Sequence, residues 1–241
     1  MRKLIAKLGP GLLYAGAAVG VSHLVQSTRA LVILANLLKY PFFNAGPLYA
    51  AANGKSLLDA FQQLGKGAMF IFYGVTFTTV FAVQAVVTLI TAGLFAYVFK
   101  INLPLWAISA VILAICSIIL LIGKFEFLNK TMKSVIFLLT IATLVTLIAA
   151  FTKSQNAFEP LTTFSFFKQE DLFFLIALVG WMPAPIDISL WQSEWSLAQA
   201  KSKGSLSLKD ALFDFRVGYW GTTFLAAAFV GLGALLIFGS G

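Results

Sequence analysis

Long apolar runs, separated by short polar or charged stretches, make up most of the chain. A helix needs about 20 apolar residues to cross the hydrocarbon core of a bilayer. The runs are continuous and lack the alternation that the strands of a membrane barrel require. The pattern therefore predicts an all-α, polytopic membrane protein with seven spans, at residues 9–28, 30–52, 68–99, 104–123, 131–152, 171–194 and 217–238.

The composition agrees with this pattern, because 60% of the residues are hydrophobic and only 11% are charged. So few charges cannot cover the core of a water-soluble domain, which ordinarily has about 25% charged residues. This excludes a soluble enzyme, a nucleic-acid-binding module and a disordered protein. The chain has no P-loop, GxSxG or HExxH motif, so we expect no enzyme and no permanently bound cofactor. The expected partner is the lipid bilayer, with no nucleic acid and no obligate protein partner.

The distribution of Lys and Arg along this chain, whose net charge is +8, orients the predicted spans. Cytoplasmic loops of membrane proteins carry an excess of Lys and Arg. With a cytoplasmic N-terminus, the outside segments hold only Arg29, Lys100, Lys153 and Lys168. The inside segments then hold Arg2, Lys3, Lys7, Lys55, Lys66, Lys124, Lys130, Lys133, Lys201, Lys203, Lys209 and Arg216. We therefore expect an integral protein of the bacterial cytoplasmic (inner) membrane with its N-terminus in the cytoplasm.

Two of the predicted spans are interrupted near their middle. Pro183 and Pro185 each remove a backbone donor and clash with the preceding turn, so a continuous helix through both is unfavourable. The first span carries Gly16 and Gly20 at a comparable depth. Broken helices at corresponding positions of two repeats mark the binding site of many transporters. We expect both spans to be unwound, around residues 20–23 and 182–187, and to lie side by side.

A short internal echo accompanies the two breaks. Leu-Val-Gln-Ser at residues 24–27 follows the first, and Leu-Trp-Gln-Ser at 190–193 follows the second. The echo is five predicted spans apart, and an odd offset inverts the second unit in the membrane. The predicted organisation is a first five-span repeat in residues 1–152, an extracytoplasmic loop in 153–170, and the start of an inverted second repeat, with spans six and seven, in 171–241.

Asp187 and His23 are the ionisable residues placed deepest in the predicted spans, and both fall at the breaks. Intramembrane ionisable residues are candidates for function because burying their charge is costly. With carbonyls freed by the breaks, they would surround a cation or a proton. The alternatives are that Asp187 caps the helix that it begins and that His23 is simply packed and hydrogen-bonded. We expect the other acids in loops or at span ends: Asp59, Glu126, Glu159, Glu170, Asp171, Glu194, Asp210 and Asp214.

Three further side chains near the breaks are candidates for substrate or ion binding. Met182 could offer a soft thioether to a metal, although packing beside Trp181 is the alternative. Gln26 and Gln192 follow the two breaks, where they could line a polar path or bond between helices. Lys39 lies within the second predicted span, and the sequence shows no obvious partner for it.

These motifs resemble the Nramp (natural resistance-associated macrophage protein) family of proton-coupled divalent metal transporters. The resemblance rests on Gly-Pro-Gly-Leu-Leu at residues 9–13, Lys-Tyr-Pro-Phe-Phe at 39–43, Gly-Pro at 46–47, and the Met-Pro of the broken sixth span. It implies a leucine-transporter-like inverted-repeat fold, with broken spans one and six and a second repeat truncated after span seven. It also implies a symporter for a divalent cation of the manganese, iron or magnesium class, with protons as the coupled ion.

The resemblance assigns metal-site positions residue by residue. In the first broken span the family pattern Asp-Pro-Gly-Asn has Gly20 in place of its Asp and His23 in place of its Asn. In the sixth span the pattern Met-Pro-His-Asn has Ala184, Ile186 and Asp187 in place of its Met, His and Asn. The metal would then be held by Asp187 and His23, which would also couple protons. The alternatives are a cation-coupled carrier of amino acids or other organic solutes with the same fold, and a non-transporting truncated paralogue.

Overall fold

The computed structural model describes residues 8–19, 31–123, 125–153, 167–204 and 207–236. Every regular element within these ranges is a helix, which confirms the all-α class. The helices are α2 (Pro10–Ala18), α4 (Leu31–Asn53), α5 (Leu57–Leu64), α6 (Lys66–Phe99), α7 (Leu105–Ile122), α8 (Phe125–Lys153), α9 (Gln169–Trp181), α10 (Asp187–Lys203) and α11 (Leu208–Leu236).

Three of these helices are long and apolar enough to cross a membrane. They are α6, α7 and residues Phe127–Thr152 of α8, with mean hydropathies of 2.0, 2.9 and 2.5. They coincide with the predicted spans at 68–99, 104–123 and 131–152. The protein is therefore a helical membrane protein by the length and composition of these helices, and the other four spans stay predictions.

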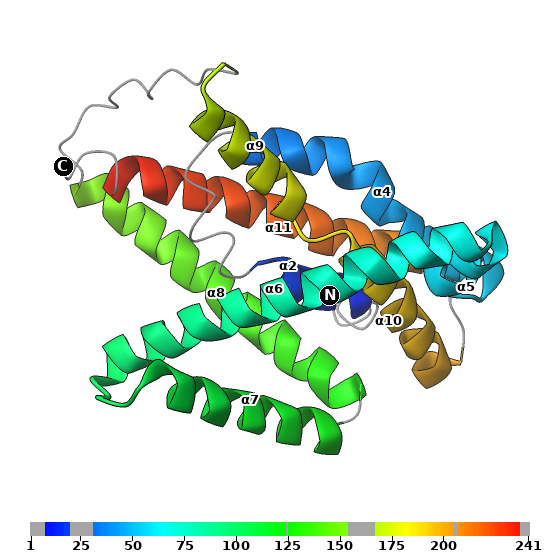
Figure 1. Cartoon of the computed structure of the whole chain (residues 1–241), viewed down its shortest axis with the longest axis horizontal. Helices are drawn as coiled ribbons and strands as arrows, with labels where there is room; N and C mark the ends of the chain where they lie inside the picture. Colours follow the sequence, from blue (N-terminus) through cyan, green and yellow to red (C-terminus); the bar gives the residue numbers. More distant parts are fainter. Residues whose placement is uncertain (1–7, 20–30, 124, 154–166, 205–206, 237–241) are drawn as a thin grey trace. The chain divides into compact units, whose positions relative to one another are not determined.

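The chain divides into two compact units, of which one comprises residues 58–131. In this unit α6 and α7 pack together and run in opposite directions (Figure 1). The turn between them begins at Lys100, which has a left-handed conformation with φ of 53°, and Pro104 precedes α7. This turn lies where the predicted spans at 68–99 and 104–123 leave a gap.

The other unit comprises residues 1–57 and 132–241. Here α4 packs against both α10 and α11, and α2 contacts both of those helices as well (Figure 1). Its core is aromatic: Tyr14 of α2 stacks on Tyr219 of α11 with ring centroids 5.6 Å apart, and the edges of Phe43 and Phe215 complete the cluster. The packing brings the N-terminal helix against the C-terminal one.

At Gly11 and Gly218, α2 and α11 also approach each other through backbone atoms. A Cβ atom on Gly218 would lie 1.8 Å from the carbonyl oxygen of Gly11, and one on Gly11 would lie 1.9 Å from the carbonyl oxygen of Asp214. Small residues allow membrane helices to approach this closely. The two glycines therefore fix the distance at which α2 crosses α11.

Asp214 corrects one expectation from the sequence. The sequence pattern predicts this residue in a loop or at a span end, but it lies within α11 and is only 1% exposed. Its carboxylate accepts the backbone N–H groups of Gly9 and Gly11, each at 2.7 Å. The first N–H groups of a helix need acceptors, and Gly9 has no side chain to supply one. Asp214 therefore caps a helix that lies some 200 residues earlier in the chain.

Candidate functional site: the break between α9 and α10

The predicted interruption of the helix at residues 182–187 is present. Helix α9 ends at Trp181 and α10 begins at Asp187, with a non-helical connection between them (Figure 1). A continuous helix would need N–H donors from residues 183 and 185 for the carbonyls of Val179 and Trp181, and both positions are proline. The two missing N–H donors therefore cause the interruption of the helix.

The end of α2 lies against this break. Helix α2 ends at Ala18, and Ala18 belongs to the same buried cluster as Ala184, which lies in the connection. Tyr14 and Phe43 complete the contact, and Ile188 of α10 packs against it. The end of α2 thus lies against the connection between α9 and α10, whereas the predicted break at residues 20–23 falls outside the described residues. Gly20, His23 and Gln26 lie outside the described residues, so their places in the site stay predictions.

Asp187 is the first residue of α10 and is half-buried. The backbone N–H groups of Asp187 and Ile188 and the side chain of Trp191 interact with its carboxylate. The capping alternative is therefore present in part, although the N–H of Ile188 also donates to the carbonyl oxygen of Pro185 at 3.1 Å. Its Oδ1 atom, however, is buried and has no partner within the described ranges. One carboxylate oxygen thus remains available to a ligand.

Other buried polar atoms of α10, α2 and α4 also lack partners in the described part of the chain. Both amide atoms of Gln192 are unpartnered, and the residue is 0% exposed. The same holds for the hydroxyl of Tyr14, which is also 0% exposed, and for Oδ1 of Asn44. These atoms come from α10, α2 and α4, and α10 contacts the other two helices. Buried polar atoms are rarely left unpaired, so each calls for a water or a ligand.

The two candidates from the family's methionine motif are enclosed by apolar side chains. Met182 is 0% exposed and packs in a cluster of Val32, Ala35, Leu178 and Ala226. Ala184 is 1% exposed within the aromatic cluster. The packing alternative for Met182 is therefore the one that the structure favours, because its thioether faces hydrocarbon groups rather than the polar atoms of α10.

Lys39 has a partner that the sequence could not reveal. Its Nζ donates a hydrogen bond to the carbonyl oxygen of Gly180, in the last turn of α9, at 3.1 Å. A cation at the C-terminal end of a helix is favourable, as is an anion at the N-terminal end. The break is therefore flanked by two opposite charges, with Lys39 at the end of α9 and Asp187 at the start of α10.

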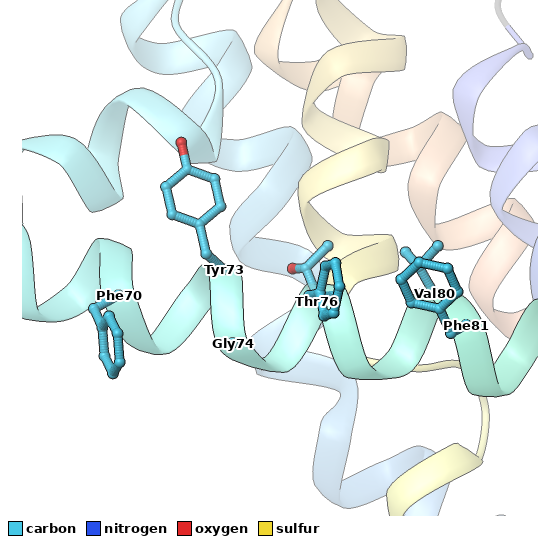
Figure 2. Close-up of a pocket in the computed structure, with 7 residues that line it drawn as sticks. Phe70, Tyr73, Gly74, Thr76, Val80 and Phe81 are labelled. Atoms are coloured by element: carbon cyan, nitrogen blue, oxygen red, sulfur yellow. The ribbon is translucent and has the colours of Figure 1, made fainter.

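A hollow in the unit of residues 58–131 is lined by uncharged side chains. This hollow, of about 600 Å³, lies along α6, where Gly74 leaves a gap between aromatic side chains (Figure 2). It is lined by Phe70, Tyr73, Gly74, Thr76, Phe77, Val80 and Phe81. None of these side chains is charged, so the hollow suits hydrocarbon rather than an ion. No group of three or more His, Cys, Asp or Glu side chains that could hold a metal occurs within the described residues.

Comparison with known proteins gives one informative match. The chain is 36% identical, over 250 aligned residues, to an uncharacterized protein of Pasteurella multocida (strain Pm70). The alignment covers 98% of this chain but 57% of that relative, so the chain spans little more than half of the relative's length. No family model and no solved structure matches the chain.

Proposed function

We propose that the protein is a secondary transporter that binds a small cation at the break between α9 and α10. The observation that carries the proposal is Asp187, a carboxylate at the start of a half-helix with one buried oxygen left unpartnered. Broken helices at membrane depth are expected only where they are buried or line a cavity. The proposed setting is the inner membrane, with the N-terminus in the cytoplasm and protons as the coupled ion, as in the Nramp family.

The donor atoms favour a hard divalent cation such as magnesium or manganese. Carboxylate, amide and hydroxyl oxygens are offered by Asp187, Gln192, Asn44 and Tyr14, and such oxygens suit hard cations. The soft thioether of Met182 is enclosed in an apolar cluster. The same oxygens would also accept hydrogen bonds from the water shell of a hydrated ion. Iron, which favours imidazole, depends on His23 and is the weaker candidate.

One observation favours a second candidate, an organic solute carrying an amine. Gln192 has an unpartnered Nε2 donor as well as an unpartnered oxygen, and a metal ion would satisfy the oxygen alone. An amino acid would place its amine near Asp187 and offer an acceptor to Gln192. Gln192→Leu removes both atoms, so it should abolish binding of an amino acid but weaken that of a divalent cation only in part.

Proton coupling is assigned to His23 together with Asp187. Imidazole changes its charge near neutral pH, and a metal needs the neutral ring. Cation binding should then weaken as the pH falls. His23→Gln keeps a polar side chain that cannot titrate, so the pH dependence of uptake between about pH 5.5 and 7.5 should flatten if the histidine titrates near its reference value. An unaltered slope would remove His23 from the coupling step.

Ligand-induced stabilisation tests the proposal directly. The purified chain would be heated in detergent with a panel of divalent cations and, separately, of amino acids. A ligand that binds the folded state alone raises the thermal midpoint with increasing concentration. We expect magnesium or manganese to do so, and uptake of the same ion into proteoliposomes to follow. Stabilisation by amino acids alone would establish the second candidate. No stabilisation and no uptake would leave a non-transporting membrane protein.

A further inference from the structure

At the C-terminal end of α9, two carbonyls lack the N–H partners that a longer helix would supply. Leu178 O accepts the N–H of Met182 at 2.8 Å and closes the last regular turn. The partners that Val179 and Trp181 would have in a longer helix are Pro183 and Pro185, which have no N–H. The last carbonyls of a helix also carry the negative end of its dipole. This end therefore has both the oxygen atoms and the potential that attract a cation.

The side chain of Lys39, which belongs to another helix, supplies a cation at this end of α9. Lys39 of α4 donates to Gly180 O at 3.1 Å, although the two residues are 141 positions apart in the sequence. Lys39 is half-buried, in a helix whose neighbouring side chains are largely apolar. The hydrogen bond lies at an exposed position, where the negative end of the α9 dipole helps to balance the ammonium charge. The carbonyl end of α9 supplies that balance.

We propose that the Lys39 ammonium is a resident cation in a site that would otherwise take a monovalent metal ion such as sodium. Broken-helix transporters coordinate their coupling ions with unwound carbonyls and with the C-terminal ends of half-helices. Here a covalently held charge occupies one oxygen of this kind, that of Gly180. The protein therefore needs no sodium or potassium to hold α9 in place against α4. This inference concerns the end of α9 and does not rest on transport at Asp187.

The competing interpretation is that Lys39 merely supplies a hydrogen bond to Gly180. The two interpretations separate when the charge and the hydrogen bond are removed independently. Lys39→Met keeps the aliphatic stem and removes both, whereas Lys39→Gln keeps an N–H donor and removes the charge alone. Lys39→Arg keeps both. A simple hydrogen-bonding role predicts that Lys39→Gln resembles the wild type.

The test is the thermal midpoint of the purified chain in sodium, potassium or N-methylglucamine chloride at one ionic strength. The wild type and Lys39→Arg should unfold at the same temperature in all three salts. Lys39→Met and Lys39→Gln should unfold several degrees lower in N-methylglucamine and recover with rising sodium or potassium, as mass action requires for a site of the folded state. Lys55→Met, at an exposed lysine of the same unit, is the control and should show no salt-specific change.

Each outcome decides the matter. Cation-specific recovery in Lys39→Gln supports the resident-cation site even if Lys39→Met does not fold. Midpoints of Lys39→Gln that are equal in all three salts would overturn it. Specific stabilisation of the wild type by sodium, to the same extent as the variants, would overturn it as well, because the site would then not be filled by the lysine.

Discussion

The carboxylate of Asp214 accepts the backbone N–H of Gly11 at 2.7 Å, and the two residues come from opposite ends of the chain. Its other oxygen accepts the N–H of Gly9 at the same distance. The pair links the start of α2 to α11, two helices that also touch through the backbone at Gly218. Since the end of α2 lies against the connection between α9 and α10, this link helps to determine where α2 meets α10.

Replacing Asp214 with Asn should destabilise the protein. The amide would keep one acceptor for Gly9 or Gly11, but its NH₂ group would face the other backbone N–H, and two donors cannot bond. Loss of a buried, charge-assisted hydrogen bond with an unsatisfied donor left behind costs about 1–3 kcal/mol. The thermal midpoint in detergent measures this. A midpoint equal to that of the wild type would show that Asp214 does not hold α2.

Two glycines three residues apart in α11 test the backbone crossing. Gly218→Ala places a Cβ 1.8 Å from Gly11 O, so α2 must move and the protein should lose stability. At Gly221 a Cβ would meet nothing within 4 Å. Gly221→Ala should therefore be neutral or stabilise the helix by up to about 1 kcal/mol. The prediction fails if the two variants unfold at the same temperature.

Two stacked tyrosines should respond differently to loss of the hydroxyl. Tyr219 donates to Asn36 O at 2.5 Å, so Tyr219→Phe leaves a buried carbonyl with one partner fewer and should cost about 0.5–1.5 kcal/mol. The hydroxyl of Tyr14 has no partner among the described residues. Tyr14→Phe should leave the thermal midpoint of the empty protein unchanged or raise it, while weakening cation binding. A lower midpoint for Tyr14→Phe would show that this hydroxyl has a structural partner.

The sequence was sufficient for features that depend on local chemistry. Apolar runs predicted α6, α7 and α8 as membrane-capable helices, because length and composition alone decide that property. The pair Pro183 and Pro185 predicted the break, because each removes a donor whatever surrounds it. The position of Asp187 at the start of a half-helix followed from the same two prolines.

Features that depend on tertiary contacts were not accessible in the same way. Asp214 lies in a stretch with other charges, and nothing in that stretch shows that it caps α2 some 200 residues away. Lys39 likewise meets Gly180 only through the packing of α4 on α9. The sequence does not decide the roles of Met182 and Gln192, because these depend on the side chains that pack around them. The structure encloses the first in an apolar cluster and leaves the second buried with unpartnered atoms.

Cation binding by Asp187→Asn tests the central claim most directly, since the substitution keeps the size of the side chain and removes its charge. The control is Glu170→Gln, which removes an exposed acid from the first turn of the other half-helix, α9. Titration with magnesium or manganese, followed by thermal midpoint, should give full stabilisation for wild type and control. Asp187→Asn should remain folded in detergent and lose at least tenfold in affinity. Equal affinity of all three proteins would contradict the account and leave Asp187 as a helix cap.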